Sequence, residues 1–149
     1  MSVEYMGAYL NAAGVRSFNV PGAGAALAEQ GHLSNAIVVP ANASIVHITG
    51  QVGARENGKV PSDIREEYRQ AFENVKAVLE ATGVKEGWKA VYKVHFLTLD
   101  TSVERLGEWL KNIKLYCGES RPTTMAIGVS SIAWEGATLE IFVEAVRES

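Results

Sequence analysis

The sequence predicts an α+β fold in which two helices lie on one face of a mixed sheet. Apolar side chains recur at helical spacing in residues 64–79 and again in residues 103–117, which indicates the helices. Short β-branched runs before, between and after them indicate strands, the clearest being residues 91–98 and 138–146. The predicted order of elements is β-β-α-β-α-β-β.

The composition predicts one globular domain and argues against several classes of protein. We expect a single domain over residues 1–149, in which residues 1–35 form an extended N-terminal segment. With 14 Lys and Arg against 17 Asp and Glu, the net charge of −3 gives no basic patch for nucleic acid. The single cysteine suits a reducing compartment, and we find neither an export signal nor a long apolar run. We therefore expect a cytoplasmic protein that does not bind membranes.

The first predicted strands form a hairpin. Residues 37–39 and 44–49 are rich in β-branched side chains, and the segment 40–43 between them contains a proline and an asparagine. Farther along the chain, Asn57-Gly58 predicts a turn. Upstream, Gly22-Ala-Gly24 lacks the preceding strand and the third glycine of a nucleotide-binding loop, so we expect a loop or short helix there.

Both helices carry recognisable end signals. In the first, Asp63 and Glu66 fit a capping pair, and Gly83 lies where a left-handed C-terminal cap is expected. In the second, Thr101 and Glu104 fit another capping box, and Gly118 ends the helix. The apolar stripe expected along the second helix consists of Val103, Leu106, Leu110, Ile113 and Cys117. We expect Cys117 to be buried and inert, because the C-terminal end of a helix disfavours a thiolate.

The predicted sheet has more apolar surface than two helices can cover. Its later strands are expected at residues 91–98, 123–129 and 138–146, with a loop around Trp134 before the last of them. The first and last of these strands are apolar on both faces. Since two helices cover one face only, the other face predicts oligomerisation.

Several motifs match those of a known family. Residues 71–83 (AFENVKAVLEATG) match its central helix, and residues 47–51 (HITGQ) match the end of an early strand. Residues 93–97, Pro122 and residues 139–147 match three further motifs in the same order. On these residues the chain resembles the Rid family of reactive intermediate deaminases, also called YjgF-type proteins or L-PSP endoribonucleases.

The resemblance implies an architecture and a reaction. Family members are homotrimers with a chorismate-mutase-like fold, whose sheets form a central barrel with a cleft at each subunit interface. They hydrolyse the enamine and imine products of amino-acid dehydratases and release ammonia. No cofactor is implied, and the three histidines lack the spacing of metal ligands, so we expect no metal.

The chain departs from the family at the positions that carry its chemistry. The arginine that grips the substrate carboxylate corresponds to Thr124, and a nearby cysteine corresponds to Ala126. A hydroxyl cannot replace the planar, charged fork of an arginine. The glutamate that positions water corresponds to Phe142, which makes the expected cleft more apolar.

Other cleft positions are partly retained. The family tyrosine corresponds to Leu33, and an asparagine of the second helix corresponds to Gly107. Thr49 stands for a serine, and Gly50 is retained. With Thr124, Phe142 and Trp134, these four residues form the predicted substrate-binding set. For Trp134 we expect an aromatic wall beside a flat ligand.

Three residues are candidates for catalysis. Glu140 matches the family's first glutamate and is either a carboxylate in a partly buried site or an ordinary solvated one. His32 precedes the cleft position at Leu33, and Arg121 is the cation nearest to Thr124 in sequence, although it is also readily placed in solvent. His47 and His95 lie on strands and form an acid–base pair only if they meet across the sheet.

The leading hypothesis is a divergent Rid-family homotrimer that binds or converts a small metabolite in its interfacial cleft. The chemistry would be water addition to an imine, an enamine or a related carbonyl compound. A non-catalytic ligand-binding or interaction module is an alternative, and so is ordinary imine deamination by relocated residues such as Arg121 or His32. The acidic chain gives little support to a ribonuclease. Chorismate mutase ranks last, because the sequence offers few arginines for a dianionic substrate.

Overall fold

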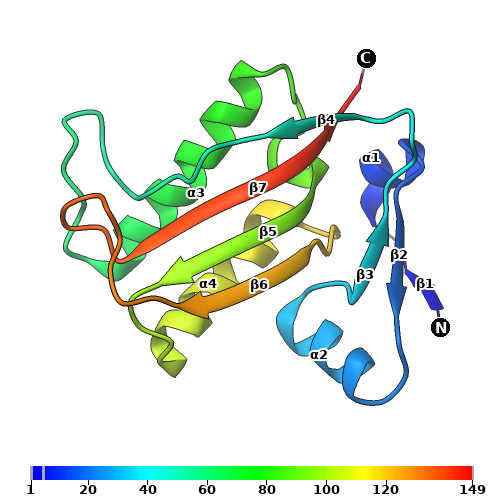
Figure 1. Cartoon of the computed structure of the whole chain (residues 1–149), viewed down its shortest axis with the longest axis horizontal. Coiled ribbons are helices and arrows are strands. Elements are labelled where there is room, and N and C mark those ends of the chain that lie inside the picture. Colours follow the sequence, from blue (N-terminus) through cyan, green and yellow to red (C-terminus); the bar gives the residue numbers. More distant parts are fainter. Residues whose placement is uncertain (1, 5, 149) are drawn as a thin grey trace.

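The computed structural model describes residues 2–4 and 6–148, which form two sheets (Figure 1). In chain order the elements are β1 (Ser2–Glu4), α1 (Gly7–Ala12), β2 (Arg16–Asn19), α2 (Ala23–Gly31), β3 (Ala36–Val38), β4 (Ser44–His47), α3 (Ile64–Ala81), the 3-10 helix η1 (Gly87–Ala90), β5 (Val91–Thr98), α4 (Val103–Cys117), β6 (Thr123–Gly128) and β7 (Leu139–Arg147).

The larger sheet has the strand order β4-β7-β5-β6. Strands β5 and β6 are parallel and joined through α4, whereas β7 is antiparallel to both β4 and β5. Figure 1 shows α3 and α4 behind this sheet and no helix over the middle of its front. The predicted α+β fold with a mixed sheet and one helix-covered face is therefore confirmed.

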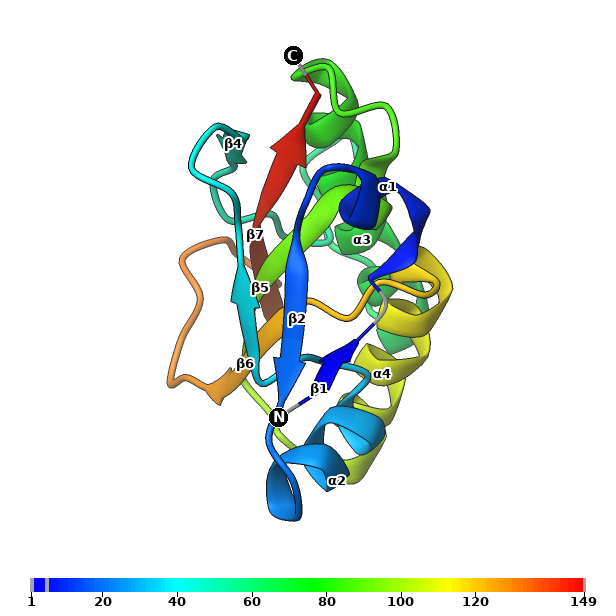
Figure 2. The ribbon, with the colours of Figure 1, turned by 90° about the vertical axis from the view of Figure 1, so that its right-hand side faces the viewer.

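The smaller sheet is formed by the N-terminal part of the chain. Its strands β1, β2 and β3 are antiparallel neighbours, and Figure 2 shows them beside the end of the main sheet. Residues 1–35 were expected to be an extended segment, yet their described part contains two strands and two short helices. Helix α2 begins within the glycine-rich stretch, where we expected a loop or a short helix, and the short helix is confirmed.

The predicted hairpin between residues 37–39 and 44–49 is wrong. Strand β3 pairs with β2, and β4 pairs with β7, so the two segments belong to different sheets. A turn closed by the Ala43 N–H and the Pro40 carbonyl (3.0 Å) separates them. Strand propensity shows that a segment is extended, but the partner depends on packing that lies outside the segment.

Helix α3 begins where the sequence predicts. The Asp63 carboxylate accepts from the backbone N–H groups of Arg65 (2.9 Å) and Glu66 (3.1 Å). The side chain of Glu66 does not complete the capping box, because it pairs with Arg55 at 2.8 Å. At the other end, Gly83 has the expected left-handed conformation, with φ of 88°.

Helix α4 differs from its prediction at the first turn. Its N-cap is Ser102, whose Oγ accepts from the Arg105 N–H at 3.3 Å, and not Thr101. Val103 and Leu106 were placed on the apolar stripe but are 91% and 37% exposed, whereas Trp109 is buried. Six residues at about 100° each put Val103 roughly 120° around the helix from Trp109. The stripe is confirmed at Ile113 and Cys117, which are buried.

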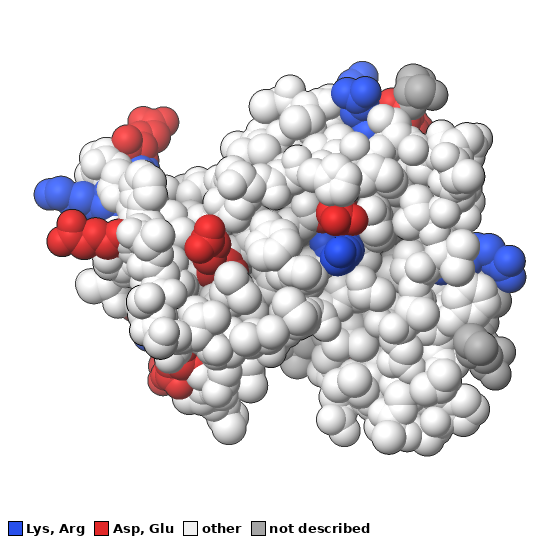
Figure 3. Space-filling view, in the orientation of Figure 1, with Lys and Arg blue, Asp and Glu red and all other residues white. Residues whose placement is uncertain are grey.

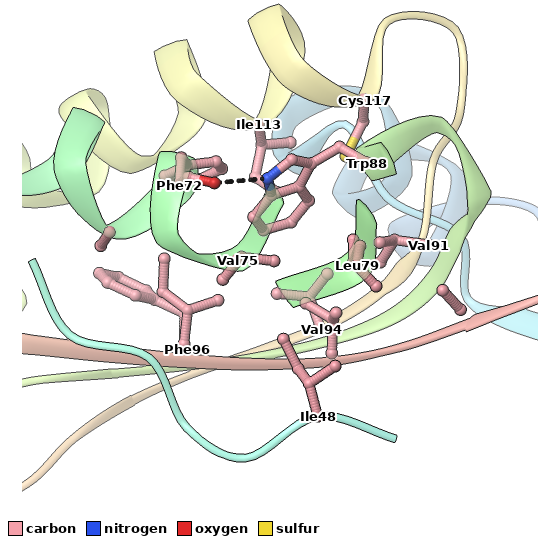
Figure 4. Packing of buried hydrophobic residues seen from close by; sticks show 14 of the residues in the cluster. Ile48, Phe72, Val75, Leu79, Trp88, Val91, Val94, Phe96, Ile113 and Cys117 are labelled. Atoms are coloured by element: carbon pink, nitrogen blue, oxygen red, sulfur yellow. Dashed lines mark hydrogen bonds between the residues drawn. The ribbon is translucent and has the colours of Figure 1, made fainter. Parts of the chain in front are cut away.

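The main core lies between the sheet and these two helices (Figure 4). Phe72 stacks on Trp88 at 4.6 Å between ring centroids, and Phe96 stacks on Trp109 at 4.1 Å. The Trp88 indole donates to the Phe72 carbonyl at 2.9 Å, which satisfies its buried N–H. Cys117 is fully buried here, and burial raises the pKa of its thiol, as expected for an inert cysteine.

A second apolar cluster joins the N-terminal part to the main sheet. Its buried members are Met6, Leu10, Val15 and Val146, the last of which lies on β7. The Ser120 hydroxyl donates to the Met6 carbonyl at 2.9 Å and reinforces the junction. Within the described residues, none of the helices combines the length and the apolar character needed to cross a bilayer.

Candidate functional site

A pocket of about 320 Å³ lies at the end of β7 that is joined to the loop before it. We call it the Glu140 pocket, after the half-buried glutamate of β7 that lines it. The other residues that line it are Gly50, Gln51, Val52, Ala54, Asn74, Ala133 and Trp134. The structure thus brings together three of the predicted site residues, namely Glu140, Gly50 and Trp134.

Gly50 lets the glutamate lie against the backbone. A Cβ atom at this position would overlap the Glu140 carboxylate and crowd its Cγ at 2.9 Å. The neighbouring Gln51 exchanges backbone hydrogen bonds with Ile141 of β7, at 2.7 and 2.9 Å. The segment that contains Gly50 is therefore fixed to β7, and the absence of a side chain leaves the space that the carboxylate occupies.

Asn74 supports the pocket from α3. Its amide donates to the carbonyls of Val52 (2.8 Å) and Ala54 (2.9 Å), and its oxygen accepts from Gln70 at 2.9 Å. Sequence reasoning missed this residue. The available signal was a pair of amides at i and i+4, Gln70 and Asn74, beside the buried stripe of an amphipathic helix.

Trp134 closes another side of the pocket. Its indole donates to the Gly58 carbonyl at 3.0 Å, and the side chain is 49% exposed. Gly58 belongs to the turn predicted from Asn57-Gly58, and its N–H donates to the Arg55 carbonyl at 2.8 Å. The tryptophan is therefore anchored by a turn that lies far from it in sequence.

Buried Glu67 on α3 holds the end of the loop that carries Trp134. Its carboxylate accepts from the Thr138 N–H (2.7 Å) and the Thr138 hydroxyl (2.6 Å). Arg105 of α4 donates to the same hydroxyl at 2.8 Å and lies 3.9 Å from the carboxylate. This bridge joins both helices to the start of β7, two residues before Glu140.

The carboxylate of Glu140 is left without a cation. Over residues 2–4 and 6–148 it forms no salt bridge and no side-chain hydrogen bond, and the pocket lining contains no Lys, Arg or His. Nearby arginines are used elsewhere: Arg55 pairs with Glu66 at 2.8 Å, and Arg105 contacts Thr138. A half-buried, unpaired carboxylate beside an aromatic ring is suited to accept a proton or to face a positive charge.

A second group of polar residues lies around Glu144 on the uncovered face of the sheet. The Tyr92 hydroxyl donates to Glu144 at 2.6 Å, Lys93 lies at 3.5 Å, and His47 lies at 3.3 Å. Burial acts to raise the pKa of Glu144, but Tyr92, Lys93 and His47 together hold this pKa below its usual range. Burial and Glu144 in turn raise the pKa of Tyr92. The Glu144 carboxylate therefore has its hydrogen-bond and ion-pair partners within the fold, and its role is structural.

The two strand histidines do not form an acid–base pair. Strand β7 lies between their strands, so His47 contacts Glu144 whereas His95 packs edge-on against Phe142, with ring centroids 4.4 Å apart. Burial and Lys93 lower the pKa of His95. Phe142 therefore lies on the uncovered face, as Glu140 does two residues earlier on β7, but it is not among the residues that line the Glu140 pocket.

The predicted residues His32 and Arg121 belong to a different part of the molecule. His32 follows α2 and donates through Nε2 to the Gly118 carbonyl at 2.7 Å. Burial lowers its pKa, although the hydrogen bond to Gly118 opposes the change. Arg121 pairs with Glu29 at 3.2 Å. Neither residue lines the Glu140 pocket.

The other predicted binding residues are also dispersed. Leu33 donates its N–H to the Ala28 carbonyl at 3.0 Å. Thr124 pairs in register with Val94, and its hydroxyl donates to the Pro122 carbonyl at 3.2 Å. Thr49 is exposed on the strand extension before Gly50. Gly107 is exposed on α4, with open space where a Cβ would lie. Their roles in binding remain predictions.

Comparisons with known proteins agree with this fold. The family model described as Endoribonuclease L-PSP matches residues 23–147. The chain belongs to this family.

Solved structures of the L-PSP family resemble the chain over most of its length. YyfB, a Rid-family protein of Yersinia pestis, shares 24% identity with a TM-score of 0.76, over 89% of this chain and 98% of its own. TdcF of Escherichia coli, solved with bound serine, shares 25% identity with a TM-score of 0.61, over 74% of this chain and 85% of its own. The resemblance read from the sequence motifs is thereby confirmed.

One curated relative of this chain is a 2-iminobutanoate/2-iminopropanoate deaminase of Dermatophagoides farinae. It is 50% identical over 42 residues, which is 27% of this chain. The match spans 33% of the length of that relative. The deaminase similarity is therefore local, whereas the fold similarity covers most of the chain.

Proposed function

We propose that this L-PSP family member hydrolyses a small imine, or the enamine that tautomerises to it, in the Glu140 pocket. The observation that carries the proposal is the half-buried Glu140 carboxylate, which lies over Gly50 with no cation paired to it. The partial identity to an iminobutanoate/iminopropanoate deaminase supports the class of reaction. Glu140, which matches the first glutamate of the family motif in the sequence resemblance, is the proposed acid–base group.

The proposed reaction needs one group that takes and returns a proton. As the oxygen of water bonds to the carbon of the protonated imine, the C=N π electrons move to nitrogen and neutralise it, and Glu140 takes a proton from the water. The product is a carbinolamine. Glu140 then returns its proton to the nitrogen, the C–N bond breaks to release ammonia, and the hydroxyl becomes the carbonyl as its proton passes to solvent, which replaces the proton that the imine took up. The overall change is imine plus water to carbonyl compound plus ammonia.

The proposal includes a homotrimer whose subunits meet through the uncovered face of the main sheet. Figure 3 shows few charged side chains over the middle of this face, where one acidic and one basic group lie together. Its apolar residues include Leu97 and Phe142, and the outer strand β6 exposes Met125 and Ile127. Exposed apolar surface of this kind favours association. A cytoplasmic location is also proposed, which the single buried cysteine suits.

The test follows ammonia release from an imine. An amine oxidase that converts a primary amine to its imine generates a substrate without a carboxylate in the cuvette, and ammonia release is measured with and without the protein. We expect acceleration by the wild type, a loss of about 10²–10⁴-fold in Glu140→Gln because general acid–base catalysis contributes that much, and no change in Glu135→Gln. Glu135 is exposed on the loop beside Trp134. Its substitution by glutamine removes the same charge as Glu140→Gln, but outside the pocket.

A Glu140→Gln protein with full activity would contradict the proposal. A protein that binds ligands but never accelerates release would favour the non-catalytic alternative. Ordinary deamination by relocated residues has one observation in its favour, because the hydrogen bond from His32 to the Gly118 carbonyl holds its imidazole against the segment that leads to Arg121. That alternative requires activity to fall in Arg121→Ala or His32→Ala, whereas the Glu140 mechanism requires both variants to retain it.

A further inference from the structure

We infer that the ligand of the Glu140 pocket carries its positive charge on a planar group and has no carboxylate. The inference rests on the proposed function, because it names the class of substrate for the same pocket. Three features of the pocket lead to it: its charge, its aromatic wall and its amide support.

Within one subunit, the charge of the pocket comes from Glu140 alone. Gly50, Gln51, Val52, Ala54, Asn74, Ala133 and Trp134 bring no charge, so the lining has one carboxylate and no cation. From this lining an anionic ligand would meet repulsion and no compensating cation, which makes a carboxylate group unfavourable in this space. A protonated imine or amidine would pair with Glu140 through a charge-assisted hydrogen bond.

Nearby cations already have partners on the described part of the chain. Arg55, the cation closest in sequence to the lining residue Ala54, pairs with Glu66 at 2.8 Å. Arg105 is engaged with Thr138. If either arginine turned to bind a ligand carboxylate, it would lose its existing contact.

The aromatic wall favours a flat cation. The Trp134 indole is anchored through its N–H to the Gly58 carbonyl at 3.0 Å, so the ring is held beside the pocket while half of its surface stays exposed. Tryptophan is the best partner for a cation placed over an aromatic face. Glu140 and Trp134 therefore recognise the same charge in two ways, one through hydrogen bonding and one through the ring.

The neutral side of the pocket adds shape without charge. The Asn74 amide donates to the carbonyls of Val52 and Ala54, at 2.8 and 2.9 Å. Its N–H groups are therefore used within the pocket wall. The wall is fixed before a ligand enters, which lowers the entropic cost of binding. A compact planar group, and not a long flexible one, fits a pocket of about 320 Å³.

The experiment compares three flat probes of nearly equal shape by calorimetry. Benzamidine is a cation at neutral pH, benzamide is neutral, and benzoate is an anion. We expect benzamidine to bind the wild type at least about tenfold more tightly than benzamide, since hydrogen bonds to charged groups contribute about 1.5–3 kcal/mol, and benzoate to bind most weakly.

Two pocket variants and one control variant test whether benzamidine binds in the pocket. Glu140→Gln should reduce benzamidine affinity at least about tenfold, while Glu135→Gln should leave it unchanged. Trp134→Leu should reduce it about two- to fivefold, as expected for a cation–π contact at a partly exposed site. The probe comparison uses wild-type protein alone, so it stands even if a variant fails to fold.

Benzoate binding as tightly as benzamidine would overturn the inference, and so would benzamidine affinity that is unchanged in Glu140→Gln. An absence of binding by all three probes at millimolar concentration would overturn it too. Because binding is measured without turnover, its failure is separate from failure of imine hydrolysis. Benzamidine binding that depends on Glu140, in a protein that hydrolyses no imine, would retain the ligand class and remove the proposed reaction.

Discussion

Gly50 and Gly53 lie near the pocket, and a Cβ atom at each would meet a different neighbour. Alanine substitutions at the two positions should therefore distinguish an effect on ligand binding from an effect on stability. A Cβ on Gly50 would meet the end of the flexible Glu140 side chain, whereas a Cβ on Gly53 would meet the backbone carbonyl of Glu67. The first obstacle can swing away and the second cannot.

We therefore predict that Gly50→Ala displaces the Glu140 carboxylate and abolishes benzamidine binding, with a loss of stability below about 1 kcal/mol. Gly53→Ala should cost about 1–3 kcal/mol, because it forces a backbone shift. Urea unfolding and calorimetry on the two variants check this pair. Equal losses of stability, with binding intact in Gly50→Ala, would show that the carboxylate does not depend on the glycine.

At the residue scale the sequence indicated only part of the site. Glu140, Gly50 and Trp134 were predicted and lie in one pocket, because their positions follow from family motifs that the chain retains. Asn74 was missed, since its role depends on a loop that packs against α3 from more than 20 residues away. Gly107 was assigned by counting along the chain and is exposed on α4.

Between elements, buried Glu67 ties α3 to the start of β7. It is 2% exposed and accepts two hydrogen bonds from Thr138. Its removal would leave the Thr138 N–H without its acceptor. We predict that Glu67→Ala lowers the free energy of unfolding by about 2–3 kcal/mol.

The control is Glu66→Ala, one residue earlier in the same helix turn. Its ion pair with Arg55 is half-exposed on both sides, so we expect a cost of less than about 1 kcal/mol. Urea denaturation compares the two. A cost for Glu67→Ala no larger than that for Glu66→Ala would mean that the bridge contributes nothing to stability.

Glu144 joins β7 to β4 and β5 and should make stability depend on pH. Its pKa is lowered in the folded state, so the unfolded chain takes up this proton first as the pH falls. The stabilisation is present above the usual carboxyl pKa of 4.5 and is lost as the pH falls below it through the lowered value.

Thermal unfolding measured between pH 7 and pH 3 should therefore show a weaker acid dependence in Glu144→Gln than in the wild type. Glu135→Gln, on the exposed loop, should follow the wild-type curve. If the curves of wild type and Glu144→Gln ran parallel throughout, the cluster of Tyr92, Lys93 and His47 would not stabilise the ionised carboxylate.

The elements themselves were more predictable than their partners. The prediction for β5 and for α3 matched the structure, because each has a strong local pattern and a clear end signal. The hairpin prediction for the segments at β3 and β4 failed, since both runs are short and pair with strands distant in sequence. The first turn of α4 was misassigned because its burial is set by where Trp109 packs.

For the whole molecule, the uncovered face of the main sheet is the feature that predicts assembly. Ile127 on β6 is 40% exposed on this face, and Leu115 on α4 is 72% exposed on the helical side. We predict that Ile127→Lys converts a trimer into monomers in light scattering, because an unpaired charge would be buried at the interface. Leu115→Lys should leave the trimer intact.

Dissociation by Leu115→Lys, or a wild type that is monomeric at micromolar concentration, would place the interface elsewhere or remove it. The general prediction of a bare apolar face came from counting helices against strands, and it needed no knowledge of tertiary contacts. The N-terminal sheet could not be derived in this way, because its strands are three or four residues long and their partners become clear only in the folded chain.

The central claim is that the Glu140 pocket holds the ligand. A crystal structure of the protein grown with benzamidine tests it most directly. The account predicts that the amidinium lies within hydrogen-bond distance of the Glu140 carboxylate, with the ring against Trp134. Benzamidine bound beside His32 and Arg121, with the Glu140 pocket holding only solvent, would contradict it.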